Sequence, residues 1–136
     1  MFKRIGHTAF TVENMENSLH FYCDVLGIKK VFELKEPNTG APWIVYLKVT
    51  DGQFIELFYG GNKKNQWDSS TIGYNHICLE VENIQEIANS IKSKGATLDS
   101  EPKQGIDFNW QCWISDPDGN RIEFMQLDPK SPHMNC

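Results

Sequence analysis

The sequence lacks several features that would assign a protein to a class at once. No apolar run is long enough to cross a membrane, and the first residues lack the charged-then-apolar pattern of a signal peptide. Lysine and arginine are not clustered, and the formal net charge of the 136 residues is −5, which argues against nucleic acid as the main partner. We therefore expect a cytoplasmic protein with neither a nucleic acid nor a membrane as its partner.

Cysteine is sparse and carries no recognisable pattern. The four cysteines, Cys23, Cys78, Cys112 and Cys136, show neither a C-x-x-C pair nor the spacing of a small disulfide-rich domain. Such cysteines are expected to be reduced thiols. Cys78 and Cys112 fall in predicted strands, where a cysteine more often packs as a small apolar residue than acts as a nucleophile.

What the sequence does contain is an internal repeat. The segment from His7 to Met15 (HTAFTVENM) returns as the segment from His76 to Ile84 (HICLEVENI). Each copy is followed by an Ile-Glu-hydrophobe strand, in which Glu56 follows His7 by 49 residues and Glu123 follows His76 by 47. Two half-domains therefore each carry one histidine and one glutamate at equivalent places.

Hydrophobic periodicity predicts the same order of elements in both halves. In residues 1–59 we expect a strand at 5–12, a helix from Asn14 to Gly27, a strand at 28–36, and a hairpin of strands 43–50 and 53–59. A polar linker follows at 60–71. In residues 72–128 we expect a strand at 74–81, a helix from Asn83 to Gly95, a short strand at 97–100, a loop at 101–107, and a hairpin of strands 110–115 and 121–127. Residues 129–136 have no pattern and are expected to form a loose tail. The fold class is then α+β, with two βαβββ modules that form an open curved sheet.

The repeated histidines and glutamates suggest a metal site. Because side chains alternate along a strand, Glu56 shares a face with Phe54 and Phe58, an unfavourable place for a carboxylate unless a cation neutralises it. Two imidazoles and two carboxylates, from His7, Glu56, His76 and Glu123, suit Zn, Ni, Co, Mn or Fe(II). The alternative is that these residues make ordinary hydrogen bonds and ion pairs. Their recurrence in both halves favours the metal.

Other candidate residues are weaker. The four tryptophans, Trp43, Trp67, Trp110 and Trp113, are able to line an apolar pocket, although core packing explains most buried tryptophans. His20 lies within the first predicted helix and His133 in the tail, and the sequence identifies no partner for either.

With these residues in place, the chain resembles the glyoxalase I/bleomycin resistance/dioxygenase superfamily, also called vicinal oxygen chelate proteins. The resemblance extends to about Leu127. It is carried by the His7 strand, by SLHFY at 18–22 with Leu26-Gly27, by Ile55-Glu56-Leu57, by GYNH at 73–76, and by DPDG at 116–119 before Ile122-Glu123. Because all four ligand positions are present, bacterial glyoxalase I is the branch that the chain resembles most.

The resemblance implies a cytoplasmic lactoylglutathione lyase-type enzyme that works on the hemithioacetal of methylglyoxal and glutathione. It implies one divalent metal per site, nickel or zinc before the other candidates, held by His7, Glu56, His76 and Glu123. Glu123 is the expected catalytic base and Glu56 its near-symmetric partner. It further implies a homodimer, with His7 and Glu56 of one subunit facing His76 and Glu123 of the other.

The chain departs from the bacterial glyoxalase I pattern at two positions that hold the glutathione carboxylates. Thr11 stands where the family has an arginine, and Gly60 where it has an asparagine. Lys3, Arg4 and Arg121 are candidate replacements. Two alternatives therefore stay open: an epimerase or isomerase that uses the same metal on a substrate without glutathione, and a metal-free protein that sequesters a flat apolar ligand.

Overall fold

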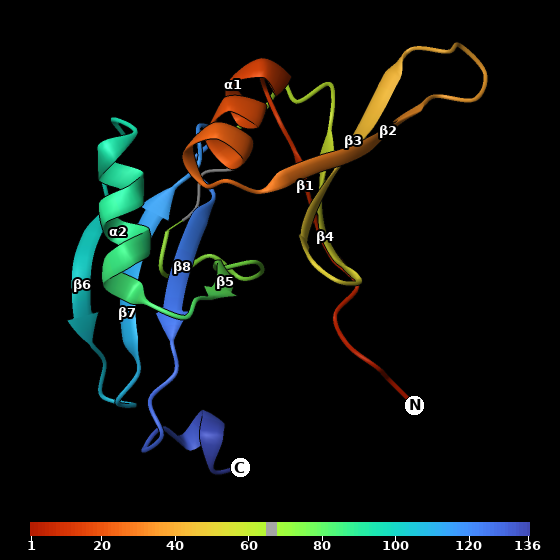
Figure 1. Ribbon diagram of the computed structural model, residues 1–136. Helices are drawn as coiled ribbons and strands as arrows, with labels where there is room; N and C mark the ends of the chain where they lie inside the picture. The colour runs from red at the N-terminus through yellow and green to blue at the C-terminus, as the bar shows by residue number, and fades with distance from the viewer. Residues whose placement is uncertain (65–67) are drawn as a thin grey trace. The chain divides into compact units, whose positions relative to one another are not determined.

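The structure, a computed structural model, describes residues 1–64 and 68–136 (Figure 1). The chain divides into two compact units, Met1–Gln66 and Trp67–Cys136, which we describe one at a time. Trp67 and the middle of the predicted linker lie outside the described residues. Each unit contains one four-stranded mixed sheet, and the helix of each βαβββ module follows its first strand.

The first unit has the predicted order of elements. They are β1 (His7–Thr11), α1 (Met15–Leu19), a π-helical turn η1 (His20–Val25), β2 (Lys29–Lys35), β3 (Pro42–Thr50) and β4 (Gln53–Phe58). The strands are arranged β1-β4-β3-β2, with β1 parallel to β4 and the other neighbours antiparallel. The parallel pairing places the first and last strands of the module side by side.

The helix of the first unit is not the single regular helix that the sequence predicts. The Asn14 side chain caps it by accepting a hydrogen bond from the Asn17 amide at 3.0 Å. After Leu19 the turns widen into a π-helix, seen for example where the Leu26 amide donates to the Phe21 carbonyl at 3.0 Å. Hydrophobic periodicity in the sequence could not predict the π-helical turn, because the widened turn still buries apolar residues. Tyr22 of this turn is buried together with the sheet residues that form the core of this unit, among them Phe10, Val45, Leu47, Ile55 and Leu57.

The second unit repeats the arrangement. Its elements are β5 (Ile77–Glu80), α2 (Ile84–Ser93), β6 (Ser100–Gln104), β7 (Trp110–Ser115), β8 (Arg121–Gln126) and a short 3-10 helix η2 (Pro132–Met134). The strands are arranged β5-β8-β7-β6, with β5 parallel to β8. Asn83 caps α2 through the amides of Gln85 and Glu86. The buried face of α2 and the sheet supply the core of this unit, which includes Ile84, Ala88, Ile91, Cys112, Ile114, Ile122 and Phe124.

The turn between β7 and β8 is held by a buried aspartate. Asp116 is 4% exposed, and its carboxylate accepts hydrogen bonds from the amides of Asp118 and Asn120 and from the Asn120 side chain. Gly119 has a φ of +86°, which a side chain would strain. The aspartate and glycine of the DPDG segment therefore have a direct structural role.

Two of the sequence expectations for the second unit are wrong. The strand expected at 97–100 lies further on, at Ser100–Gln104, within the segment expected to be a loop. This strand is at the edge of its sheet, where Pro102 is tolerated and no apolar alternation is required. The strand expected from Tyr74 begins only at Ile77, so His76 lies just before it.

The expected loose tail is also a wrong prediction, since the segment is tied to the rest of its unit. Ser131 is fully buried, and η2 follows it. Asn109, at 1% exposure, accepts a hydrogen bond from the Asp128 amide at 3.0 Å and lies 3.0 Å from the His133 ring nitrogen. The contact between Asn109 and His133 joins residues 24 apart in the sequence, which no local pattern reveals.

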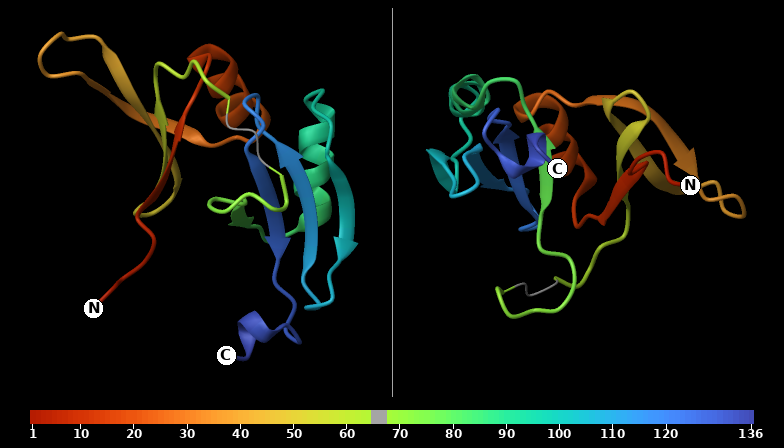
Figure 2. Two further views of the ribbon diagram at one scale, coloured as in Figure 1. Left: turned by 180° about the vertical axis from the view of Figure 1, so that it is seen from behind. Right: turned by 90° about the horizontal axis from the view of Figure 1, so that it is seen from below.

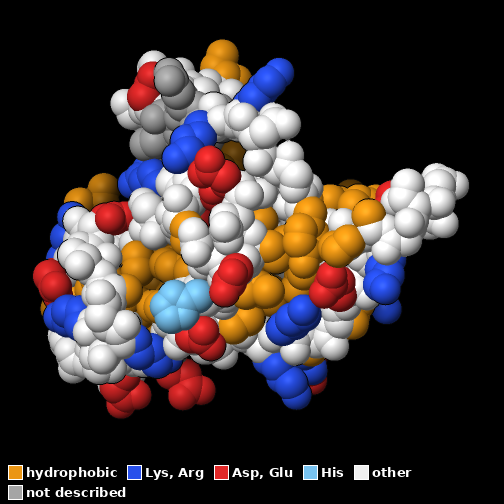
Figure 3. All heavy atoms as spheres, turned by 90° about the horizontal axis from the view of Figure 1, so that it is seen from above, with side chains coloured by type: hydrophobic (Ala, Val, Ile, Leu, Met, Phe, Trp, Pro, Cys, Tyr) orange, Lys and Arg blue, Asp and Glu red, His pale blue; other side chains and the backbone are white. Residues whose placement is uncertain are grey.

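The charge distribution on the surface and the lengths of the helices match what the sequence predicts. Figure 3 shows lysine and arginine interspersed with aspartate and glutamate on the face drawn there. Among the described residues, no helix is both long and apolar enough to cross a membrane.

Candidate metal-binding site

The first unit brings one predicted pair of ligands together. His7 lies at the start of β1 and Glu56 in the neighbouring strand β4, where the register pairs Ala9 with Glu56. The His7 Nδ1 atom is 3.3 Å from the Glu56 Oε1 atom. More than half of the His7 side chain is exposed, whereas only 9% of the Glu56 side chain is.

Tyr46, one of a group of neighbouring aromatic rings, lies beside the Glu56 carboxylate. Tyr46 is directly opposite it in the register, and the Tyr46 ring stacks on Phe32 at 4.2 Å and meets the edge of Phe54 at 6.4 Å. Partial burial raises the pKa of the Tyr46 hydroxyl, and the charge of Glu56 and a hydrogen bond to it raise that pKa further. Tyr46 is therefore a neutral hydrogen-bond donor to a carboxylate on an aromatic face, as the alternation of Phe54, Glu56 and Phe58 predicts.

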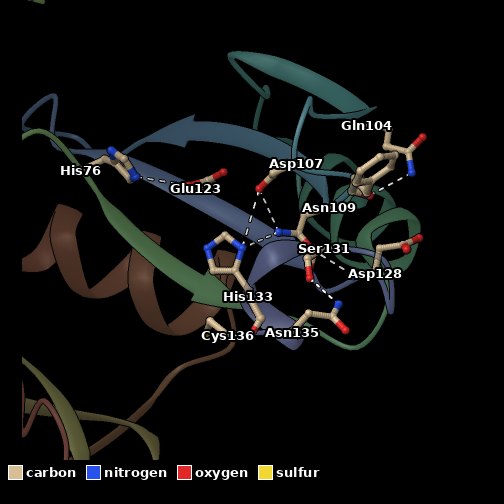
Figure 4. Close-up of polar contacts among 11 residues, drawn as sticks. His76, Gln104, Asp107, Asn109, Glu123, Asp128, Ser131, His133, Asn135 and Cys136 are labelled. Atoms are coloured by element: carbon tan, nitrogen blue, oxygen red, sulfur yellow. Dashed lines mark hydrogen bonds and ion pairs between the residues drawn. The ribbon is translucent and has the colours of Figure 1, made fainter.

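The second unit brings the other predicted pair together. Figure 4 shows His76 and Glu123 joined by a dashed line, and the His76 Nε2 atom is 3.2 Å from the Glu123 Oε2 atom. The neighbouring residues Ile122 and Phe124 face the opposite way and are buried, as alternation predicts. The Glu123 side chain is 14% exposed.

Three residues that sequence reasoning did not place around this pair hold it in position. The His76 Nδ1 atom is 2.8 Å from the Asn75 Oδ1 atom, a carbonyl oxygen that can only accept. A proton on Nδ1 would be donated to this oxygen, and the lone pair of Nε2, which faces Glu123, would then be available to a metal. The His76 ring meets the edge of Trp113 at 4.8 Å, and the Arg121 guanidinium lies over the same tryptophan at 4.6 Å from the ring centre.

Cys78 lies opposite Glu123 in the register of β5 and β8. Its surface is exposed, yet neighbouring protein atoms desolvate the thiol and raise its pKa to about 12, with the charge of Glu123 and a hydrogen bond to it acting in the same direction. Cys112 is fully buried, which raises its pKa to about 11. Neither thiol has the lowered pKa of a reactive cysteine.

The donor set fits a divalent metal. Metal–nitrogen and metal–oxygen bonds of about 2.1 Å at a right angle place the two donor atoms about 3.0 Å apart, and a tetrahedral angle gives about 3.4 Å. The two His–Glu separations, 3.3 Å and 3.2 Å, fall between these values. In the described part of the chain, no three of its His, Cys, Asp or Glu residues lie close enough to hold a metal ion. Each unit therefore offers two ligands rather than a complete site.

The remaining candidates have other surroundings. His20 pairs with Asp24 at 2.9 Å on the exposed side of η1, and Trp43 and Trp110 are each 39% exposed. Thr11 is exposed on the same face as His7, and Gly60 has a φ of +94°, a conformation that glycine adopts readily. Neither position carries the arginine or asparagine of the family pattern.

Comparison with known proteins shows which family the chain belongs to. Residues 4–124 match the Glyoxalase/Bleomycin resistance protein/Dioxygenase superfamily. The chain is 31% identical over 129 residues to a probable lactoylglutathione lyase of Synechocystis sp., covering 91% of this chain and 95% of that one. It is 31% identical over 132 residues to a lactoylglutathione lyase of Neisseria meningitidis, covering 90% of each. The chain belongs to the glyoxalase/bleomycin resistance/dioxygenase superfamily.

A solved structure agrees with the architecture. The chain is similar to the trypanothione-dependent glyoxalase I of Leishmania major, with a TM-score of 0.71, 26% identity, and coverage of 92% of this chain and 87% of that one. The α+β fold with two βαβββ modules, predicted from the repeat, is confirmed.

Proposed function

We propose that the protein is a metal-dependent enzyme of the glyoxalase I type, which isomerises a small hemithioacetal by moving a proton between adjacent carbons. The observation that carries this proposal is the matched pair of His–Glu contacts, one in each unit, at the separation of two neighbouring metal ligands. The name lactoylglutathione lyase, borne by relatives 31% identical to the chain, supports the same activity.

His7, Glu56, His76 and Glu123 would together hold one divalent cation, nickel or zinc before cobalt, manganese or iron. When bound, the cation supplies positive charge that stabilises the negative charge developing on the substrate oxygens. We further propose a homodimer in which each site takes His7 and Glu56 from one subunit and His76 and Glu123 from the other, a closed two-fold arrangement.

Glu123 is the proposed base. Its side chain is 14% exposed in the single chain, against 9% for Glu56. The carboxylate would take the proton from one carbon and return it to the next, while the neutral Cys78 thiol donates a hydrogen bond to it. His76 stays oriented by Asn75 during this transfer.

Elemental analysis and turnover test the proposal together. Purified protein, stripped and reloaded with nickel or zinc, is expected to retain about one metal per subunit and to convert the hemithioacetal of methylglyoxal and glutathione, followed in the ultraviolet. Glu123→Gln and Glu56→Gln are expected to lower turnover by about 10²–10⁴-fold. Asp24→Asn is the matched control, because Asp24 forms a His–carboxylate pair with His20 outside the candidate site. Reloaded wild-type protein without metal would overturn the proposal.

A second candidate is favoured by Thr11 and Gly60, which stand where the family pattern has the arginine and asparagine that hold the glutathione carboxylates. An isomerase or epimerase with the same metal and base, acting on another thiol adduct or acid, would bind metal normally and fail to turn over the glutathione hemithioacetal. The trypanothione dependence of the Leishmania major enzyme shows that the thiol differs among similar proteins. A metal-free, ligand-sequestering protein would instead retain no metal in either the wild type or the glutamate variants.

A further inference from the structure

We propose that Gln111 is a positioning residue for the candidate metal site, acting through Trp113 to hold the ring of His76 in place. The inference deepens the proposed function and rests on it, since it concerns how one ligand of the same site is oriented. It starts from a difference between the two histidines. His7 is the first residue of β1 and is paired with Phe54 in the sheet, whereas His76 precedes β5 and lies outside the strand register.

A histidine outside a strand depends on its neighbours for the direction of its ring. The His76 ring can turn about its side-chain bonds, and only some orientations point the Nε2 atom toward the Glu123 Oε2 atom, which is 3.2 Å away. Asn75 holds the Nδ1 side of the ring at 2.8 Å, but Asn75 is in the same irregular segment and is itself exposed. A support that belongs to the sheet positions a ligand more precisely, because strands are more rigid than loops.

Trp113 supplies such a support from β7. Its ring centre is 4.8 Å from that of His76, and the two ring planes meet at 69°, an edge-to-face contact. The backbone of Trp113 is held on both sides, because β7 lies between β6 and β8 and the register pairs Trp113 with Ser100 and with Glu123. The sheet therefore fixes where the indole begins, and what remains is the rotation of the indole about its side-chain bonds.

Gln111 restricts the rotation of the indole. The Trp113 Nε1–H group, which can only donate, donates to the Gln111 Oε1 atom at 2.8 Å. The two residues are two apart on one strand, so both side chains are on the face of the sheet that carries Glu123. The nitrogen end of the Gln111 amide is confined as well, since a Cβ atom at Gly105 would meet the Nε2 atom at 2.7 Å. Gln111, Trp113 and His76 thus form a chain of contacts that ends at a candidate metal ligand.

The test measures the state of the His76 ring and the metal affinity separately. Gln111→Met removes the acceptor of the indole N–H group and keeps the length of the side chain. In metal-free protein, long-range proton–nitrogen NMR spectra report the tautomer and hydrogen bonding of each histidine ring, and His7 serves as an internal reference. Competition with a chromogenic chelator then gives the affinity of the full-length chain for nickel or zinc.

Gln111→Met is expected to shift the His76 ring signals toward those of a freely turning imidazole and to leave those of His7 in place. Metal affinity is expected to fall about tenfold, at the lower end of the effect of groups that orient a metal ligand. Trp113→Phe keeps an aromatic ring without the N–H group, so it is expected to behave like Gln111→Met. Combining the two substitutions is expected to add little, because both remove the same hydrogen bond.

Gln104→Met is the matched control, because Gln104 is in the same hairpin and donates to the Phe108 carbonyl at 2.8 Å. It is expected to change neither the His76 signals nor the metal affinity. Unchanged His76 signals in Gln111→Met, equal changes in Gln104→Met, or fully additive effects of Gln111→Met and Trp113→Phe would each overturn the inference. The proposed function fails differently, through wild-type protein that retains no metal, and the ring signals of metal-free protein test Gln111 in either case.

Discussion

The two halves of the chain present the same His–Glu pair in different surroundings. In the first unit the pair is next to aromatic rings, with Tyr46 stacked on Phe32 and Phe54 nearby. In the second unit the corresponding pair is next to an amide, a tryptophan and a guanidinium, those of Asn75, Trp113 and Arg121. The repeated residues are the ones suited to a metal, and the residues that differ are the ones suited to the substrate. We expect the aromatic residues beside the first pair to contact an apolar part of the substrate.

The largest expected effect comes from exchanging the residue before each histidine. Asn75 precedes His76 and orients it, whereas Gly6 precedes His7. Asn75→Gly would make the second pair like the first, and metal affinity is expected to fall about 10–100-fold because the imidazole loses its supporting hydrogen bond. Competition with a chromogenic chelator measures the affinity.

The matched exchange is Gly6→Asn, at a position where an added Cβ meets nothing within 4 Å. We expect this variant to fold and to bind metal at least as tightly as the wild type. Equal affinity of the wild type and Asn75→Gly would show that Asn75 does not distinguish the two halves.

A smaller effect, on stability, is expected from the turns before β3 and β7, which are held by different contacts in the two units. The turn before β3 is organised locally by the Glu36 carboxylate, whose hydrogen bonds with Thr39 and Asn38 lower its pKa. The turn before β7 is tied to the tail by buried Asn109. Asn109→Ala is expected to lower the free energy of unfolding by about 1–3 kcal/mol, because the part-buried Asp128 amide loses its acceptor. Urea unfolding measures this change.

Glu36→Gln is the control for the hairpin comparison, since it removes charge at a solvent-accessible local turn and is expected to change stability much less. Hydrogen exchange is expected to rise at 128–136 in Asn109→Ala and to stay unchanged there in Glu36→Gln. Similar losses of stability in both variants would mean that the tail contact contributes nothing specific.

The smallest effect concerns the aromatic face of the first unit. Phe32→Ala removes the ring stacked on Tyr46, and aromatic pairs contribute about 0.5–1.5 kcal/mol beyond their burial. The preference for phenylglyoxal over methylglyoxal, measured as a ratio of kcat/KM values, is expected to fall about 2–10-fold. Val49→Ala removes another exposed apolar side chain of the same sheet and is expected to leave the ratio unchanged. An equal change of this ratio in both variants would show that the aromatic face of the first unit does not contact the apolar part of the substrate.

The parts predicted correctly from the sequence are those set by local pattern. The strand at 110–115 and the turn at 116–119 agree with the structure because alternation and turn residues are local signals. The strand at 100–104 was missed because an edge strand needs no apolar alternation. The His–Glu contacts within each half followed from the repeat. The positions of Trp113 and Arg121 did not, because they depend on the register between β7 and β8, and the contact of His133 with Asn109 depends on the path of the tail.

Parallel pairing of the first and last strands of each module has a consequence for how such a protein can arise and assemble. In both units the strand at or after the histidine lies beside the strand with the glutamate, β1 beside β4 and β5 beside β8 (Figure 2). Each His–Glu contact is therefore complete within one continuous stretch of chain. A gene encoding one module can be duplicated, and two copies of the product can exchange modules, without breaking either pair. The side chains around each pair are then free to diverge.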